Sequence, residues 1–182
     1  MGRLSSFLTA LFLCLALSAA VQGRYGVEKL TVRFFSKAPI EDIEAVSTGL
    51  KGIVDFDART FAFRLPIKSF AFPSALMQKH FNENYLESDK YPNAAFKGRL
   101  QGDVNPAVDG VYPATAVGEL TIHGVTTART IPCTVTVKGG ACTVASKFRA
   151  KLADHHIEVP TLMFEKIAEE VEITVDGSLG RL

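Results

Sequence analysis

The sequence lacks an excess of charge of either sign. Its 182 residues include 20 Lys+Arg and 19 Asp+Glu. Arg3 is the only charged residue among the first 20, so removal of that segment leaves 19 residues of each sign. A nucleic-acid-binding protein is expected to carry a basic excess or a clustered basic face, and neither is visible. We therefore expect no nucleic-acid partner.

Long hydrophobic runs are also missing, apart from one at the N-terminus. Residues 7–17 are apolar, follow Arg3 and precede small residues, which is the pattern of a secretory signal peptide. The run is too short to cross a bilayer, and no later run is long enough, so we expect no stable membrane span. We expect residues 1–20 to be the signal peptide, cleaved after Ala20 or Gly23, and the protein to be periplasmic or secreted.

Sequence motifs of enzymes are absent. There is no Gly-x-Ser-x-Gly, no His-Glu-x-x-His and no phosphate-cradling glycine-rich loop. Asp55 with Asp57, and Glu41 with Asp42 and Glu44, are paired carboxylates beside turn-like residues, and we interpret them as solvated loop charges. Catalytic residues need not be close in sequence, but we expect a protein that is not an enzyme and has no cofactor.

Cysteine is scarce, and beyond the signal peptide only Cys133 and Cys142 occur. They flank Lys138-Gly139-Gly140, a hairpin turn signal. With Gly139 and Gly140 as the two loop residues, Cys133 faces Ser146 and Cys142 faces Val137, so the thiols are out of register for a bond. Free thiols are favoured, although a different turn would allow a disulfide in an oxidising compartment.

What the chain does contain is a series of segments with alternating apolar residues. A period of two indicates half-buried β-strands, and turn signals separate them, including Asn105-Pro106 and His123-Gly124. Pro66 and Pro132 fall inside two runs, where we expect a bulge or an edge. The strands are expected within residues 30–35, 44–56, 60–70, 94–101, 115–123, 130–137, 142–152 and 171–175.

Residues 73–86, PSALMQKHFNENYL, break this period. Leu76, Met77, Phe81 and Tyr85 recur at helical spacing after Pro73-Ser74, which predicts one short helix. One helix among about eight strands is typical of a small antiparallel barrel or a sandwich. Eight strands close into a barrel just wide enough for one small ligand.

Two segments resemble a known family. HFNENYLESDKYPNAAFKG followed by GELTIHGVTTARTI resembles the YceI family of secreted lipid-binding proteins. The similarity is strongest over residues 69–131, with weaker flanks over 27–175. It implies a mainly β fold, an extended eight-stranded antiparallel lipocalin-like barrel with one short helix, as a single domain over residues 24–182. The family's N-terminal tryptophan, its Asp-x-x-His-Ser element and the arginine near Asp-Phe-Gly-Ile are not found here.

The resemblance implies that the barrel lumen holds a long apolar ligand, such as an isoprenoid quinone, a polyprenyl phosphate or a similar lipid. The alternation then assigns ten inward side chains to the ligand-binding wall: Phe34, Phe61, Phe63, Leu65, Phe96, Leu100, Leu120, Ile122, Val144 and Phe148. Alternation alone does not distinguish a lined cavity from a packed core, which is the usual fate of such residues.

The helix is the candidate lid of such a cavity. Leu76, Met77 and Phe81 would cover one mouth, and methionine adapts to a flexible chain. The alternative is a solid barrel that serves as an interaction or envelope-associated structural module. In that case Phe35, Phe70 and Phe72 are the candidates for an exposed apolar surface.

His123 and the pair His155 and His156 are the residues that suggest chemistry. His123 is out of phase with Leu120 and Ile122 and precedes Gly124, so we interpret it as a strand-end residue outside the lumen. A zinc site with Asp154, His155 and His156 would need three or four convergent ligands. Neighbouring strand residues point to opposite faces, so we expect no metal site.

Overall fold

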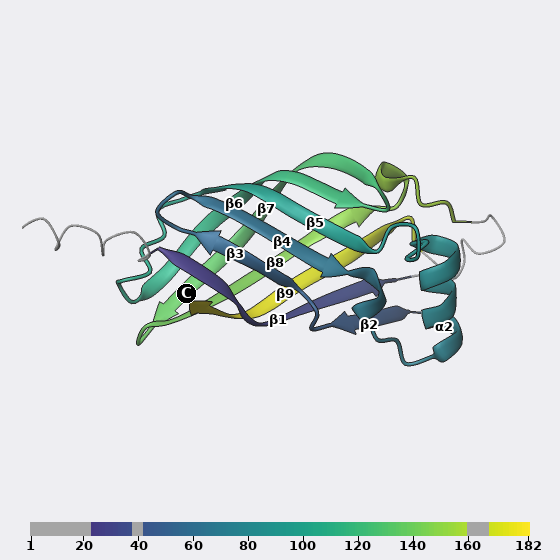
Figure 1. Cartoon of the computed structure of the whole chain (residues 1–182), viewed down its shortest axis with the longest axis horizontal. Coiled ribbons are helices and arrows are strands. Elements are labelled where there is room, and N and C mark those ends of the chain that lie inside the picture. The colour runs from purple at the N-terminus through teal and green to yellow at the C-terminus, as the bar shows by residue number, and fades with distance from the viewer. Residues whose placement is uncertain (1–22, 38–41, 160–167) are drawn as a thin grey trace, which may run out of the picture.

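The computed structural model describes residues 23–37, 42–159 and 168–182. The expected signal peptide, residues 1–20, and the loop residue Glu41 lie outside this range. The described chain is mainly β-strand, and its strands form one antiparallel sheet that closes on itself (Figure 1). The strands are β1 (Arg24–Ser36), β2 (Ile43–Ser47), β3 (Lys51–Asp55), β4 (Thr60–Pro66), β5 (Asn93–Gln101), β6 (Gly110–Ile122), β7 (Val125–Lys138), β8 (Ala141–Lys151) and β9 (Glu170–Arg181).

The nine strand segments form an eight-stranded barrel, because β2 and β3 together make one interrupted strand. Arg24 pairs with Asp55 in β3 and Val32 pairs with Ser47 in β2, and these two pairings keep the same antiparallel register along β1. Between them the backbone bends where the Gly49 N–H donates to Ser47 Oγ at 3.0 Å. Pairing of β1 with β9 closes the sheet. The expected eight-stranded antiparallel barrel is thus confirmed.

A short helical segment lies across one end of the barrel (Figure 1). It consists of α2 (Ala75–His80) and η2 (Phe81–Tyr85), a π-helical turn that continues it, close to the expected range 73–86. Ser74 caps the start, since its hydroxyl accepts a hydrogen bond from the Met77 N–H at 3.4 Å. Two 3₁₀ turns, η1 (Ile67–Ser69) and η3 (Ala153–His155), belong to the connections at the same end.

Pro132 marks the place where β7 and β8 diverge. The two strands pair from Lys138 and Ala141 only as far as Cys133 and Ser146, whereas β7 pairs with β6 from Val125 to Val137. Proline has no N–H to continue the ladder. A side-chain hydrogen bond links the two strands at this point instead: the Ser146 hydroxyl donates to the Pro132 carbonyl at 2.8 Å. The expected edge at Pro132 is confirmed, while Pro66 simply ends β4.

The hairpin between β7 and β8 has the expected turn. Gly139 and Gly140 are its loop residues, with φ of 57° and 80°, and Cys142 pairs with Val137 as the sequence predicts. Cys133 and Cys142 are free thiols. In the described part of the chain, no helix has both the length and the apolar character needed to cross a membrane.

Candidate functional site

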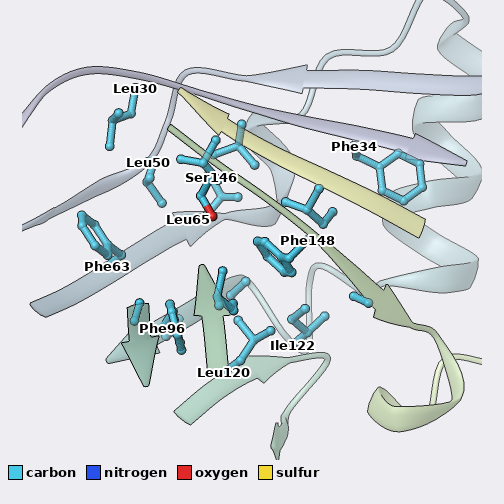
Figure 2. A pocket seen from close by; sticks show the side chains of 18 of the residues that line it. Leu30, Phe34, Leu50, Phe63, Leu65, Phe96, Leu120, Ile122, Ser146 and Phe148 are labelled. Carbon is cyan, nitrogen blue, oxygen red and sulfur yellow. The ribbon is translucent and has the colours of Figure 1, made fainter. Parts of the chain in front are cut away.

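The inner face of the barrel surrounds an apolar cavity with a volume of about 230 Å³ (Figure 2). Inward side chains of every strand except β2 contribute to its wall. Because strand residues alternate between the two faces, the long strands β6, β7 and β8 each supply a row of wall residues. The inner face of the barrel is therefore not completely filled by its own side chains.

The structure places all ten side chains that alternation assigned to the lumen on this wall: Phe34, Phe61, Phe63, Leu65, Phe96, Leu100, Leu120, Ile122, Val144 and Phe148. Phe96 and Phe148 point into the space in Figure 2 and are only half-buried, although they face inward. Half-buried inward rings are expected where a cavity separates them from the opposite wall. Ligand binding by these residues remains a prediction.

Several residues of the cavity wall were not predicted from the sequence. Leu50 reaches the cavity from the break between β2 and β3, which has no regular alternation to reveal it. Ile157 and Leu152 reach it from the connection after β8. Ile131 and Val135 continue the inward row of β7 and would have been found by extending the period of two through Pro132.

The helix contributes one side chain to the cavity. Phe81 is buried at 8% exposure and lies on the wall, whereas Leu76 is 62% exposed and neither Leu76 nor Met77 lines the cavity. Of the three lid candidates, only Phe81 is therefore part of the cavity wall. Leu76 belongs to α2 and faces outward, while the π-helical turn directs Phe81 inward.

Phe81 joins an aromatic cluster at the helix end of the barrel. Its ring centroid lies 5.5 Å from that of Phe70, 6.0 Å from that of Phe34 and 4.8 Å from that of Phe72. Phe70 is 6% exposed and lines the cavity, so its assignment to an exposed surface is wrong. Phe72 is half-buried in the same cluster, and Phe35 is half-buried on β1. Residues after β4 fold back over the barrel end, which the local sequence pattern does not reveal.

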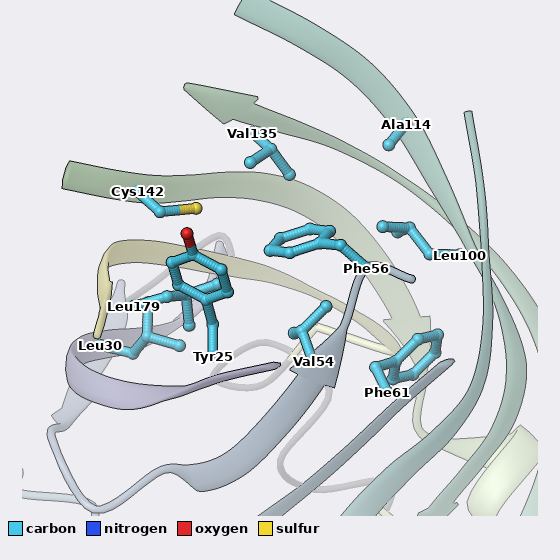
Figure 3. Close-up of a cluster of buried hydrophobic side chains, with 10 residues drawn as sticks. All are labelled: Tyr25, Leu30, Val54, Phe56, Phe61, Leu100, Ala114, Val135, Cys142 and Leu179. Atoms are coloured by element: carbon cyan, nitrogen blue, oxygen red, sulfur yellow. The ribbon is translucent and has the colours of Figure 1, made fainter. Parts of the chain in front are cut away.

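A second apolar cluster lies toward the opposite end of the barrel (Figure 3). Tyr25 and Phe56 pack edge to face with centroids 5.3 Å apart, beside Cys142 and Leu179. Burial raises the pKa of the Cys142 thiol to about 11, and burial also raises that of Cys133, which lines the cavity. Both thiols are therefore protonated near neutral pH and are poor nucleophiles.

Polar groups are rare on the cavity wall. Cysteine aside, only Ser146, Lys151 and His155 provide polar side chains among the described residues. The Ser146 hydroxyl is bound to the Pro132 carbonyl, and Lys151 is exposed to solvent. His155 is 1% exposed, so its imidazole is the one fully buried polar group on the described wall.

His123 lies outside the cavity, in the turn between β6 and β7. Its φ is 52° and that of Gly124 is 74°, as a tight two-residue hairpin turn requires. The Tyr91 ring packs against this turn and leaves no room for a Cβ at position 124, which would come within 2.5 Å of a ring carbon. The structural interpretation of His123 fits this position. Its side chain is only 11% exposed.

The groups considered for a metal site are held apart by other contacts. His123 Nε2 lies 2.7 Å from Glu87 Oε2, His155 Nδ1 lies 3.3 Å from the Val125 carbonyl, and His156 is exposed. Within residues 23–37, 42–159 and 168–182, no three His, Cys, Asp or Glu side chains converge.

The carboxylates beside the turns have structural roles. Asp55 accepts a hydrogen bond from the Ala58 N–H at 2.8 Å and one from Arg24 at 3.0 Å, and these bonds lower the pKa of its carboxyl group. Glu44 forms an ion pair with Arg33 on the neighbouring strand. Asp55 and Glu44 are thus occupied in a turn and on the outer surface, away from the cavity.

The architecture is that of a closed antiparallel β-barrel with an apolar internal cavity and one helical cover. The family model of the YceI-like domain matches residues 22–179. The chain therefore belongs to the YceI family.

Solved structures share this fold at low sequence identity. BcnA from Burkholderia cenocepacia has 18% identity and a TM-score of 0.70, covering 83% of this chain and 96% of its own. A polyisoprenoid-binding domain from Saccharophagus degradans has 15% identity and a TM-score of 0.74, covering 87% and 98%. The YceI protein of Campylobacter jejuni has 15% identity and a TM-score of 0.57, covering 81% and 85%. Comparison with curated protein sequences gives no significant match.

Proposed function

We propose that this protein is a periplasmic or secreted binding protein that holds one long apolar molecule in its lumen, such as an isoprenoid quinone, a polyprenyl phosphate or a similar lipid. The observation that carries the proposal is the apolar cavity inside the barrel, walled by aliphatic and aromatic side chains from nearly every strand. The structural similarity to a polyisoprenoid-binding domain supports the same class of ligand, and the N-terminal signal pattern supports the location.

The energetics favour a long chain over a compact polar molecule. Each buried methylene group contributes about 0.8 kcal/mol, so several isoprene units offset the cost of ordering a flexible tail. A charged or strongly polar group inside the apolar part of the lumen would lose its hydration without compensation. The polar end of the ligand is therefore expected near a barrel end.

Binding rather than catalysis is the function that this wall supports. Ser146 is engaged by a backbone carbonyl, Lys151 faces solvent, and the thiol of Cys133 is protonated. The Ser146 hydroxyl and the Cys133 thiol have no hydrogen bond to a histidine or carboxylate side chain in the described structure that would activate them as nucleophiles.

Native mass spectrometry of the mature protein tests the proposal. Protein purified from cells with intact isoprenoid metabolism should carry additional mass, and solvent extraction should release an apolar lipid. Protein that is consistently empty and takes up no added isoprenoid lipid would contradict the proposal and favour a solid interaction module.

A charge introduced on the inner wall provides a second test, and the same charge on the outer face provides its matched control. Leu120→Glu places a carboxylate at a buried cavity position and should abolish lipid retention, because the ionised group must be solvated. Thr121→Glu places the same group on the outer face of the same strand and should leave retention unchanged. Equal retention by both folded variants would show that the lipid does not occupy the lumen.

A further inference from the structure

His155 is a buried polar residue on an otherwise apolar cavity wall. It is the last residue of η3, a segment at the end of the barrel that α2 covers (Figure 1). The residue is part of the cavity wall. Its exposure is 1%. The chain reverses at His156, whose φ is 53°, and then runs to Ile157, another wall residue.

The hydrogen bonds of His155 define which ring nitrogen carries the proton. Nδ1 lies 3.3 Å from the Val125 carbonyl, and a carbonyl oxygen only accepts, so Nδ1 is the donor. Burial lowers the pKa of His155, and the charge of Arg129 lowers it further. The carbonyls of Val125 and Ile122 and the Asp154 carboxylate raise this pKa, but their effect is smaller than that of burial and Arg129 together. The ring is therefore neutral near pH 7, and Nε2 carries a lone pair.

That lone pair has no partner in the described part of the chain. Nε2 is buried and makes no hydrogen bond. A buried acceptor without a donor costs free energy comparable to a lost hydrogen bond, and such groups in native proteins usually bind a ligand, an ion or an ordered water. An apolar cavity offers a water molecule few of the polar partners that it needs.

We propose that His155 Nε2 accepts a hydrogen bond from the polar end of the lipid, so that the preferred ligand is an isoprenoid with a hydroxyl donor, either a free alcohol or a phenolic quinol. This inference rests on the proposed lipid-binding function. An oxidised quinone presents only acceptor oxygens and leaves Nε2 unpaired. The polar end then lies at the η3 end of the barrel, and the tail extends toward the apolar cluster of Tyr25 and Phe56.

Other polar groups near this end do not provide the same contact. The Thr127 hydroxyl is buried without a partner, but Thr127 is not on the cavity wall. Lys151 is on the wall but exposed, so water solvates its ammonium group. The contact to the ligand is therefore assigned to His155.

A matched pair of probes tests the donor requirement on the wild-type protein. Geranylgeraniol and its methyl ether have the same tail, and only the alcohol donates a hydrogen bond. Displacement of a bound apolar fluorescent dye should show that the alcohol binds about tenfold more tightly, as expected for pairing a buried acceptor. The ¹⁵N resonance of His155 Nε2 should shift with the alcohol and not with the ether.

Two variants locate the contact. His155→Phe should bind alcohol and ether equally, after circular dichroism shows that the variant is folded. His156→Asn is the control, because His156 is exposed and asparagine tolerates its left-handed backbone. This variant should keep the preference for the alcohol.

The outcomes separate this inference from the proposed function. Equal binding of both probes to the wild-type protein, with no change of the Nε2 resonance, would overturn the role of His155 and leave lipid binding intact. Retention of the preference in folded His155→Phe would also overturn it. Failure of both probes to bind would contradict the proposed function itself.

Discussion

Glu87 and His123 meet at the helix end of the barrel, with the carboxylate Oε2 2.7 Å from the imidazole Nε2. The other ring nitrogen of His123, Nδ1, lies 3.2 Å from the carbonyl of His155, and the Tyr91 ring packs edge-on at 4.6 Å between centroids. Glu87 follows η2, His123 links β6 to β7, and His155 ends η3. One imidazole therefore ties together three connections that are distant in sequence.

We expect His123→Asn to destabilise the protein without abolishing lipid binding. Asparagine tolerates the positive φ of this position, so the variant tests the contacts rather than the turn. Glu87 is 42% exposed, which limits the contribution of its contact with His123, and the expected loss is about 1–2 kcal/mol in the free energy of unfolding. Urea unfolding and lipid titration measure the two effects. A folded variant that no longer binds lipid would place His123 in the ligand site.

Phe81→Leu is expected to accelerate release of a bound lipid. Phe81 closes the helix end through its contacts with Phe34, Phe70 and Phe72, and leucine keeps an apolar contact while removing the ring. The cost in stability should be about 1–2 kcal/mol, because leucine leaves part of the volume of the ring empty. Transfer of a fluorescent isoprenoid to lipid vesicles measures the dissociation rate.

Leu76→Ala is the control for this experiment. Leu76 lies on the same helical segment but is 62% exposed, so its removal should leave the release rate unchanged. An equal acceleration in both variants would mean that helix stability, rather than the aromatic cluster, governs release.

The two cysteines are expected to react slowly with thiol reagents in the folded protein. Burial raises the pKa of Cys142 to about 11 and also raises that of Cys133, so little thiolate is present at pH 7. Denaturation without reductant should release two reactive thiols from the mature chain. A count of zero under those conditions would reveal a disulfide and contradict the hairpin register.

Stability should fall as the pH decreases below the ordinary pKa of histidine. Burial lowers the pKa of His155 in the folded state below its unfolded value of about 6.5. Between these two pKa values, the unfolded chain binds more protons than the folded protein. The free energy of unfolding therefore decreases on acidification through this window. Asp55 titrates below its usual 3.8 and does not interfere above pH 5.

Comparison with His155→Phe isolates this effect. Urea unfolding at several pH values should show a smaller decrease in the variant than in the wild-type protein. Identical pH profiles would indicate that His155 titrates equally in the folded and unfolded states.

Much of the candidate site follows from local patterns. Leu120 and Ile122 share a face because strand residues alternate, and this rule is the same for a strand in any sheet. Alternation alone predicts the inner surface for ten residues, without information on which strands pair, and all ten line the cavity. The Gly139-Gly140 turn likewise determined the register of β7 and β8, because a two-residue loop leaves only one way to pair the flanking residues.

The ends of the barrel were decided by tertiary structure. Phe70 looked exposed in its own segment, yet the chain after β4 folds it into a cluster with Phe81. His155 belongs to a connection with no regular period, and its burial depends on contact with Val125, 30 positions away in sequence. Alternation is a property of each strand by itself and can be seen in the sequence. The environment at a barrel end depends on which distant connections meet there, and only the closed structure brings those connections together.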